Sequence, residues 1–163
     1  MEETFIKSVQ KIFHNYKTLA EKAIDQIGDD AFHIQHDEES NSIAIIMQHM
    51  AGNMLSRWTD FYISDGEKEW RVRDNEFVDT KLSREKLIEY WEKGWDCCFN
   101  IIDNVTPDDL QKTIYIRKES HTVIDAINRQ LAHYSYHVGQ IVYLCKMYRK
   151  ADWKTLSIAR KNR

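Results

Sequence analysis

Two histidines, His133 and His137, lie four residues apart in the stretch LAHYSYHVGQIVYLCK. A four-residue step on an α-helix turns a side chain by only about 40°, so both imidazoles would point the same way. Two neutral imidazoles one helical turn apart can bind a single divalent metal ion. The alternative is that both are ordinary histidines, partly exposed or hydrogen-bonded. An isolated pair with this spacing is more often of this kind than a metal site.

His49 occupies a similar position in IMQHMAGNMLSRWTDF, at the edge of an apolar stripe that includes Ile46 and Met50. This residue is the candidate third ligand. Three imidazoles from two neighbouring helices would bind a transition metal and leave coordination positions for water or substrate. Zinc, nickel, cobalt and copper all accept imidazole ligands, so the residue types do not select the metal.

Further polar residues lie near the three histidines on the helical wheels. Asn53 and Gln140 could orient water or hydrogen-bond to a ligand, and Arg57 could receive an anionic group of a substrate. The same residues could equally be polar groups at a helix surface. Arg71 and Arg73 could clamp a carboxylate-bearing thiol, although we interpret them first as surface ion pairs with nearby acidic residues.

No serine or cysteine has a base and an orienting group at a recognisable spacing. Cys97, Cys98 and Cys145 have no zinc-ligand or redox spacing, and we interpret them as buried thiols. Any catalysis would therefore depend on the metal. The remaining histidines are interpreted as structural or exposed: His14, His33, His36 and His121.

The elements that position these residues are predicted to be helices. Apolar residues recur at intervals of three and four, which predicts helices over about 3–27, 42–63, 84–105 and 123–149. One proline and five glycines leave few turn signals for a many-stranded fold. We therefore predict an all-α, up-down four-helix bundle with long connections after the second and third helices.

Local signals refine these boundaries. Ser40 or Asn41 is expected to cap the second helix, and Thr122 with Asp125 to form a capping box at the fourth. The connection 64–82 is long for so small a bundle, which is typical of functional loops and interface elements. Alternation of apolar and polar residues around 113–116 indicates a short hairpin or an extended crossover.

The overall composition indicates one domain over residues 1–163, with a basic, solvated tail from about 150 to 163. A net charge of −3, spread along the chain, gives no footprint for nucleic acid. No apolar run is long enough to span a membrane, so we expect a cytoplasmic protein. Five tryptophans suggest that some lie at an interface, which favours a homodimer.

The stretches IMQHMAGNMLSRWTDF and LAHYSYHVGQIVYL together resemble the DinB-like (YfiT-like) superfamily of bacterial four-helix-bundle proteins, over nearly the whole chain. GNMLSRWTDFYISDGEKEWRVRDNEF further resembles a branch labelled only as a domain of unknown function. In that superfamily, one histidine on the second helix and an H-x3-H pair on the fourth coordinate nickel, zinc or a similar ion. The matching residues are His49, His133 and His137. The long connection 64–82 departs from the simplest family pattern.

The superfamily includes bacillithiol-dependent thiol transferases, a mycothiol-dependent maleylpyruvate isomerase and proposed metal-dependent hydrolases. The resemblance thus implies a metal-dependent enzyme, with zinc or nickel as cofactor, acting on a small molecule such as a low-molecular-weight thiol. One fold and one site support several chemistries, so the substrate stays open. The alternative is a non-catalytic helical-bundle dimer with a structural or adventitious metal.

Overall fold

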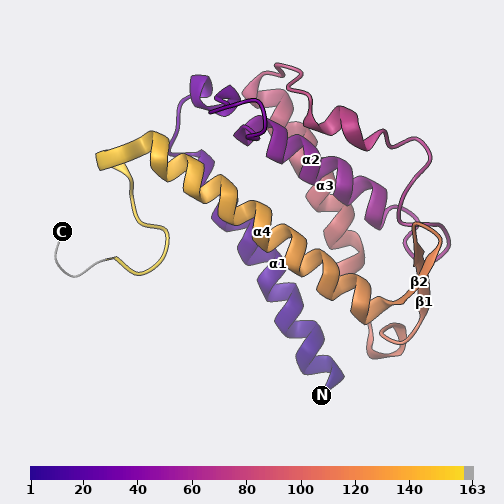
Figure 1. Ribbon diagram of the computed structural model, residues 1–163. Helices are drawn as coiled ribbons and strands as arrows, with labels where there is room; N and C mark the ends of the chain where they lie inside the picture. The colour runs from indigo at the N-terminus through magenta and orange to yellow at the C-terminus, as the bar shows by residue number, and fades with distance from the viewer. Residues whose placement is uncertain (160–163) are drawn as a thin grey trace.

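The computed structural model describes residues 1–159. Four α-helices account for most of this range, and the predicted all-helical bundle is confirmed (Figure 1). The helices are α1 (Glu2–Ile24), α2 (Ile43–Trp58), α3 (Arg84–Ile102) and α4 (Val123–Arg149), with a two-stranded sheet of β1 (Thr113–Ile116) and β2 (Glu119–Thr122) before α4. The last four residues of the predicted basic tail, 160–163, lie outside the described residues.

The helices form two packed pairs, α1 with α4 and α2 with α3, and a smaller contact joins α2 to α4. At the start of α3, Arg84 donates hydrogen bonds to the carbonyl oxygens of Ile24 and Ile27 at the end of α1. The connection after α2 therefore carries the chain back along the bundle to the end where α2 began. As a result α2 and α3 run in one direction, and α1 and α4 run in the other (Figure 1).

Side-chain caps explain where the later helices begin. Ser42, rather than the predicted Ser40 or Asn41, caps α2, because its extended backbone lets the hydroxyl accept from the amide of Ile45. The predicted capping box is present at α4. The second helix ends at Trp58, earlier than predicted, and Asp60 then adopts a left-handed backbone with φ of 49°.

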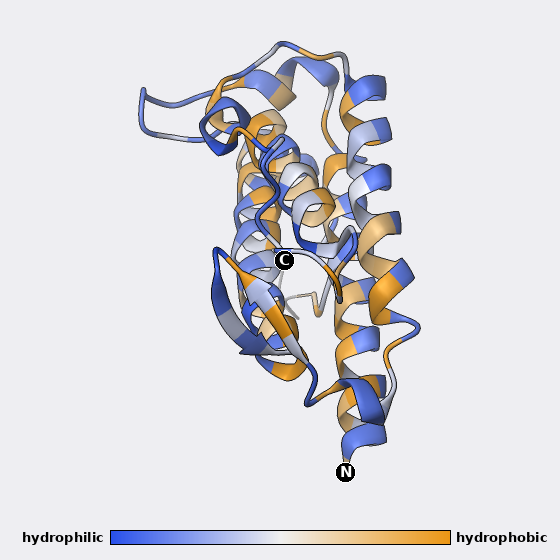
Figure 2. Cartoon of the chain, turned by 90° about the vertical axis from the view of Figure 1, so that its right-hand side faces the viewer, coloured by the Kyte–Doolittle hydropathy of each residue, from blue (hydrophilic) through white to orange (hydrophobic). Residues whose placement is uncertain are grey.

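The core explains most of the aromatic content of the chain. Trp58, Trp91 and Trp95 are fully buried between the helices, so they are core residues. Trp70 alone is strongly exposed, at 59% of its surface. Hydrophobic and hydrophilic residues alternate along each helix, as amphipathic packing requires (Figure 2).

The sheet is a hairpin rather than a crossover, since β1 and β2 pair antiparallel. Its turn residues Arg117 and Lys118 both have positive φ, the geometry of a tight two-residue hairpin turn. The Asp65 carboxylate accepts hydrogen bonds from both turn amides, at 2.8 and 2.6 Å. These bonds attach the start of the long connection to the hairpin.

No helix within residues 1–159 is long and apolar enough to cross a membrane.

Candidate metal centre

The structure brings His49 of α2 together with His133 and His137 of α4. The Nε2 atom of His133 lies 3.2 Å from Nε2 of His49 and 3.0 Å from Nε2 of His137. One ligand nitrogen from each residue can be chosen so that all three lie within 4.8 Å of one another. His49 and His137 are buried, whereas His133 is partly exposed. The histidine cluster therefore sits at the contact between the two helix pairs, with one side open.

The outer nitrogens of two of the histidines are held by hydrogen-bond acceptors. His49 Nδ1 lies 2.9 Å from a carboxylate oxygen of Glu76, and His137 Nδ1 lies 2.9 Å from the amide oxygen of Gln140. Because both partners accept, each Nδ1 carries the proton and donates it. In the neutral form of each ring Nε2 is then unprotonated, and its lone pair is directed into the cluster.

The single Nε2 of His133 can donate to only one neighbour, so at least one imidazole lone pair in the cluster is left to bind a cation. Burial and the facing imidazoles lower the pKa of His133 to about 3 and that of His137 to about 4. Both are therefore neutral at pH 7, which is the form that binds metals. Nitrogens bound to one tetrahedral zinc ion lie about 3.3 Å apart, close to the two short distances here. The donor set thus fits a divalent transition metal.

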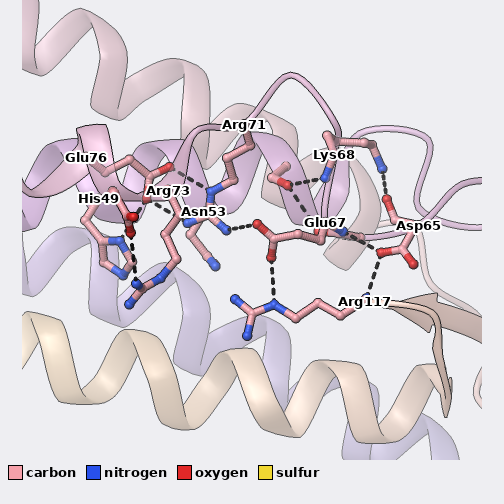
Figure 3. A network of polar contacts seen from close by, with 12 residues as sticks. His49, Asn53, Asp65, Glu67, Lys68, Arg71, Arg73, Glu76 and Arg117 are labelled. Atoms are coloured by element: carbon pink, nitrogen blue, oxygen red, sulfur yellow. Dashed lines mark hydrogen bonds and ion pairs between the residues drawn. The ribbon is translucent and has the colours of Figure 1, made fainter.

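Glu76 reaches the cluster from the long connection between α2 and α3. Its carboxylate accepts two hydrogen bonds from Arg71, both at 2.7 Å, in addition to that from His49 (Figure 3). Burial opposes ionisation of this carboxyl, but the hydrogen bonds from His49 and Arg71 outweigh it and lower its pKa. Arg71 forms ion pairs with nearby acidic residues as predicted, but these pairs are not at the surface, because only 3% of its side chain is exposed. Arg73 does form an exposed pair, with Asp74 at 3.8 Å.

A glycine on α2 makes room for this carboxylate. A Cβ atom placed on Gly52 would lie 2.2 Å from Glu76 Oε1, far inside contact distance. No other residue type fits at position 52 unless Glu76 moves. The contact between Glu76 and Gly52 could not be predicted, because Glu76 lies in a connection without helical periodicity, and an isolated glycine in a helix indicates only a less stable turn.

The open side of the histidine cluster faces a pocket of about 400 Å³. Side chains from α2 and the segment just before it, the long connection, the hairpin turn and α4 line it: Asn41, His49, Asn53, Arg57, Arg71, Arg73, Phe77, Arg117, Arg129, Gln130, His133, Tyr136 and His137. Among these described lining residues five are arginines and none is acidic. A small molecule of ordinary metabolite size fits this volume.

The residues predicted to assist the histidines occupy different parts of the site. Gln140 contacts His137, as described above, but does not line the pocket. Asn53 lines the pocket, and its amide oxygen accepts from the buried Tyr134 hydroxyl, which in turn accepts from Trp58. This chain of hydrogen bonds fixes Asn53 from the core side. Arg57 also lines the pocket and is 2% exposed.

The hairpin contributes to the same polar network. Glu67 accepts from Arg71 at 3.1 Å and from Arg117 at 3.2 Å, and so bridges the connection and the hairpin turn (Figure 3). Arg117, Arg129 and Tyr136 were not singled out from the sequence. Arg129 and Tyr136 could have been found, because each lies three or four residues from a predicted ligand on α4.

Comparisons with known proteins place this site within one family. No curated protein matches the chain. A family model does match, over residues 1–162, and therefore includes the three histidines, Glu76 and all five pocket arginines. The chain belongs to the family described as protein of unknown function, DUF1572.

Proposed function

We propose that the protein is a divalent-metal-dependent enzyme that acts on a small molecule, with His49, His133 and His137 as metal ligands. The observation that carries the proposal is the convergence of three imidazole nitrogens beside a pocket. The resemblance to the DinB-like superfamily supports it, and we place the DUF1572 family within that superfamily on the same ground.

The surroundings of the histidines favour a catalytic site over a structural one. Structural zinc sites have four protein ligands and are closed, whereas three ligands leave a position for substrate. A cation held here would lower the pKa of a bound thiol or water and polarise a substrate carbonyl. Glu76 and Gln140 would hold the imidazoles in the correct tautomer, and Glu76 would increase the basicity of His49.

Two reaction classes agree with these residues. In a thiol transferase, the activated group would be a low-molecular-weight thiol that attacks an electrophile. In a hydrolase it would be water. Two of the three described thiols are poor nucleophile candidates, since burial raises the pKa of Cys145 to about 12 and that of Cys98 well above its ordinary value. We favour the thiol transferase, because the activated thiol is then supplied by the substrate.

Metal analysis of protein purified without a metal-affinity tag tests the ligand assignment. We expect about one zinc or nickel ion per chain in the wild type, and loss of this ion in the His133→Ala, His137→Ala double variant. His14→Ala is the matched control, because His14 lies on α1, is exposed and pairs with Asp103 at the end of α3 rather than with a residue of the histidine cluster. Circular dichroism checks that each variant keeps its helices.

Activity is then measured as conjugation of cysteine to 1-chloro-2,4-dinitrobenzene, with 4-nitrophenyl acetate as the hydrolytic alternative. Metal-dependent turnover of either probe, absent from the double variant, would support the proposal and select the reaction class. A wild type that binds neither zinc nor nickel after reconstitution would overturn it and favour the non-catalytic bundle.

A further inference from the structure

Arg57 is a buried cation that has no hydrogen-bond partner among residues 1–159. Its Nε and Nη1 atoms are inaccessible to solvent and form no hydrogen bond with any described residue. The guanidinium packs against Gly66, where an added Cβ would lie 2.5 Å from Nη1, so the long connection holds it in place. Burial lowers the pKa of Arg57 only to about 10, and the side chain remains charged at pH 7. A buried donor without a partner is unfavourable, and an anionic ligand that accepts its hydrogen bonds would satisfy it.

The other pocket arginines differ in how their charge is balanced. Arg71 pairs with Glu67 and Glu76, Arg117 with Glu67, and Arg73 with Asp74. Arg129, like Arg57, forms no ion pair with any described residue. The pocket therefore contains two positive charges that no carboxylate of the described chain neutralises.

These two arginines lie toward the same end of the pocket. Arg57 follows His49 by two turns of α2, about 12 Å along the helix axis, and Arg129 precedes His133 by one turn of α4. Because α2 and α4 run in opposite directions, both steps lead toward the hairpin (Figure 1). The histidines thus occupy one end of the pocket, and the two uncompensated arginines occupy the other.

We propose that Arg57 and Arg129 form an oxyanion-binding subsite that takes a carboxylate or phosphate group of the substrate. Guanidinium groups bind both anions through paired hydrogen bonds, and two of them match a group that carries one or two negative charges. The anion would anchor the substrate at the hairpin end, while another part of the molecule reaches the histidines. This role in substrate binding rests on the proposed function, but the anion site itself does not.

Isothermal titration calorimetry of the full-length protein tests the subsite with three probes at constant ionic strength: inorganic phosphate, succinate and the neutral succinamide. We expect phosphate or succinate to bind and succinamide not to bind. The tighter of the two anions identifies the kind of group. Arg57→Gln and Arg129→Gln should each weaken this binding at least tenfold, without changing zinc content. Arg149→Gln is the matched control, since Arg149 is an exposed arginine at the far end of α4.

Each titration is run on zinc-loaded and on metal-free protein, which separates this proposal from the proposed function. Anion binding to metal-free protein that the two variants weaken supports the subsite, even if no metal-dependent activity is found. Normal zinc binding with no anion binding, or with anion binding unchanged in both variants, would overturn the subsite and leave the metal centre standing. Arg129 is exposed, so its variant keeps the test valid if Arg57→Gln fails to fold.

Discussion

Replacing Gly52 by alanine should weaken metal binding although position 52 touches no histidine ligand in the cluster. The new Cβ would lie 2.2 Å from Glu76 Oε1, whereas ordinary contacts begin at 3.4 Å. The carboxylate must therefore withdraw by about 1 Å, which breaks its 2.9 Å hydrogen bond to His49. Loss of a partner that orients a metal-bound histidine typically costs 10–100-fold in metal affinity. We expect a loss in this range, about 1.4–2.7 kcal/mol.

Gly139→Ala is the matched control for this experiment. Gly139 lies in α4, two residues from His137, and an added Cβ there meets no atom within 4 Å. Both substitutions gain about 1 kcal/mol of helix propensity. In Gly52→Ala this gain should be offset, because the buried Arg71 loses part of its partner. Metal-free Gly139→Ala should therefore be the more stable variant in urea unfolding.

Zinc affinity is measured by competition with a chromophoric chelator at pH 7, for wild type, Gly52→Ala, Gly139→Ala and Glu76→Gln. We expect Gly139→Ala to bind zinc as tightly as the wild type, and Gly52→Ala and Glu76→Gln to bind it more weakly. Zinc affinity that is unchanged in both Gly52→Ala and Glu76→Gln would refute the reasoning, because Glu76 would then have no influence on His49 as a ligand.

Three further predictions concern stability and thiol reactivity. Tyr134→Phe should lower the free energy of unfolding by about 1–3 kcal/mol in urea titrations, since it leaves two buried polar groups unpaired. The hydrogen bond from Lys112, with others nearby, lowers the pKa of Asp109 to about 2, so its ionised form stabilises the fold above pH 4. Asp109→Asn should cost about 1 kcal/mol at pH 7, and the difference should vanish as the pH falls from 4 toward 2. Native protein should react with one equivalent of Ellman's reagent at pH 8, and two more after denaturation, because Cys98 and Cys145 are buried.

The periodicity of apolar residues was sufficient to predict the helices and most of the core. The limits of α4 match the prediction, because a capping box marks its start and the apolar pattern runs without interruption. The end of α2 was predicted too late. Apolar residues such as Phe61 continue the helical spacing beyond Trp58, and nothing in the pattern indicates the left-handed backbone at Asp60.

The site was predictable only where its residues lie on helices. The spacing of His133 and His137 and the position of His49 on its helix followed from helical geometry. Glu76 and Arg71 instead belong to a connection whose path depends on hydrogen bonds that Asp65 and Glu67 accept from the hairpin, more than 40 residues away. Sequence periodicity carries no information on such a path, so the partner of His49 could not be identified.

The division of the bundle into two helix pairs has a consequence for how its two halves are joined. His49 belongs to the α2 and α3 pair, and His133 and His137 belong to the α1 and α4 pair, while direct packing between α2 and α4 is limited. An ion held by all three would act as a cross-link between the two halves, in addition to the buried hydrogen bonds of Tyr134 with Trp58 and Asn53. Loss of the ion would remove this cross-link on the pocket side of the bundle, while the shared hydrophobic core would still join the two pairs.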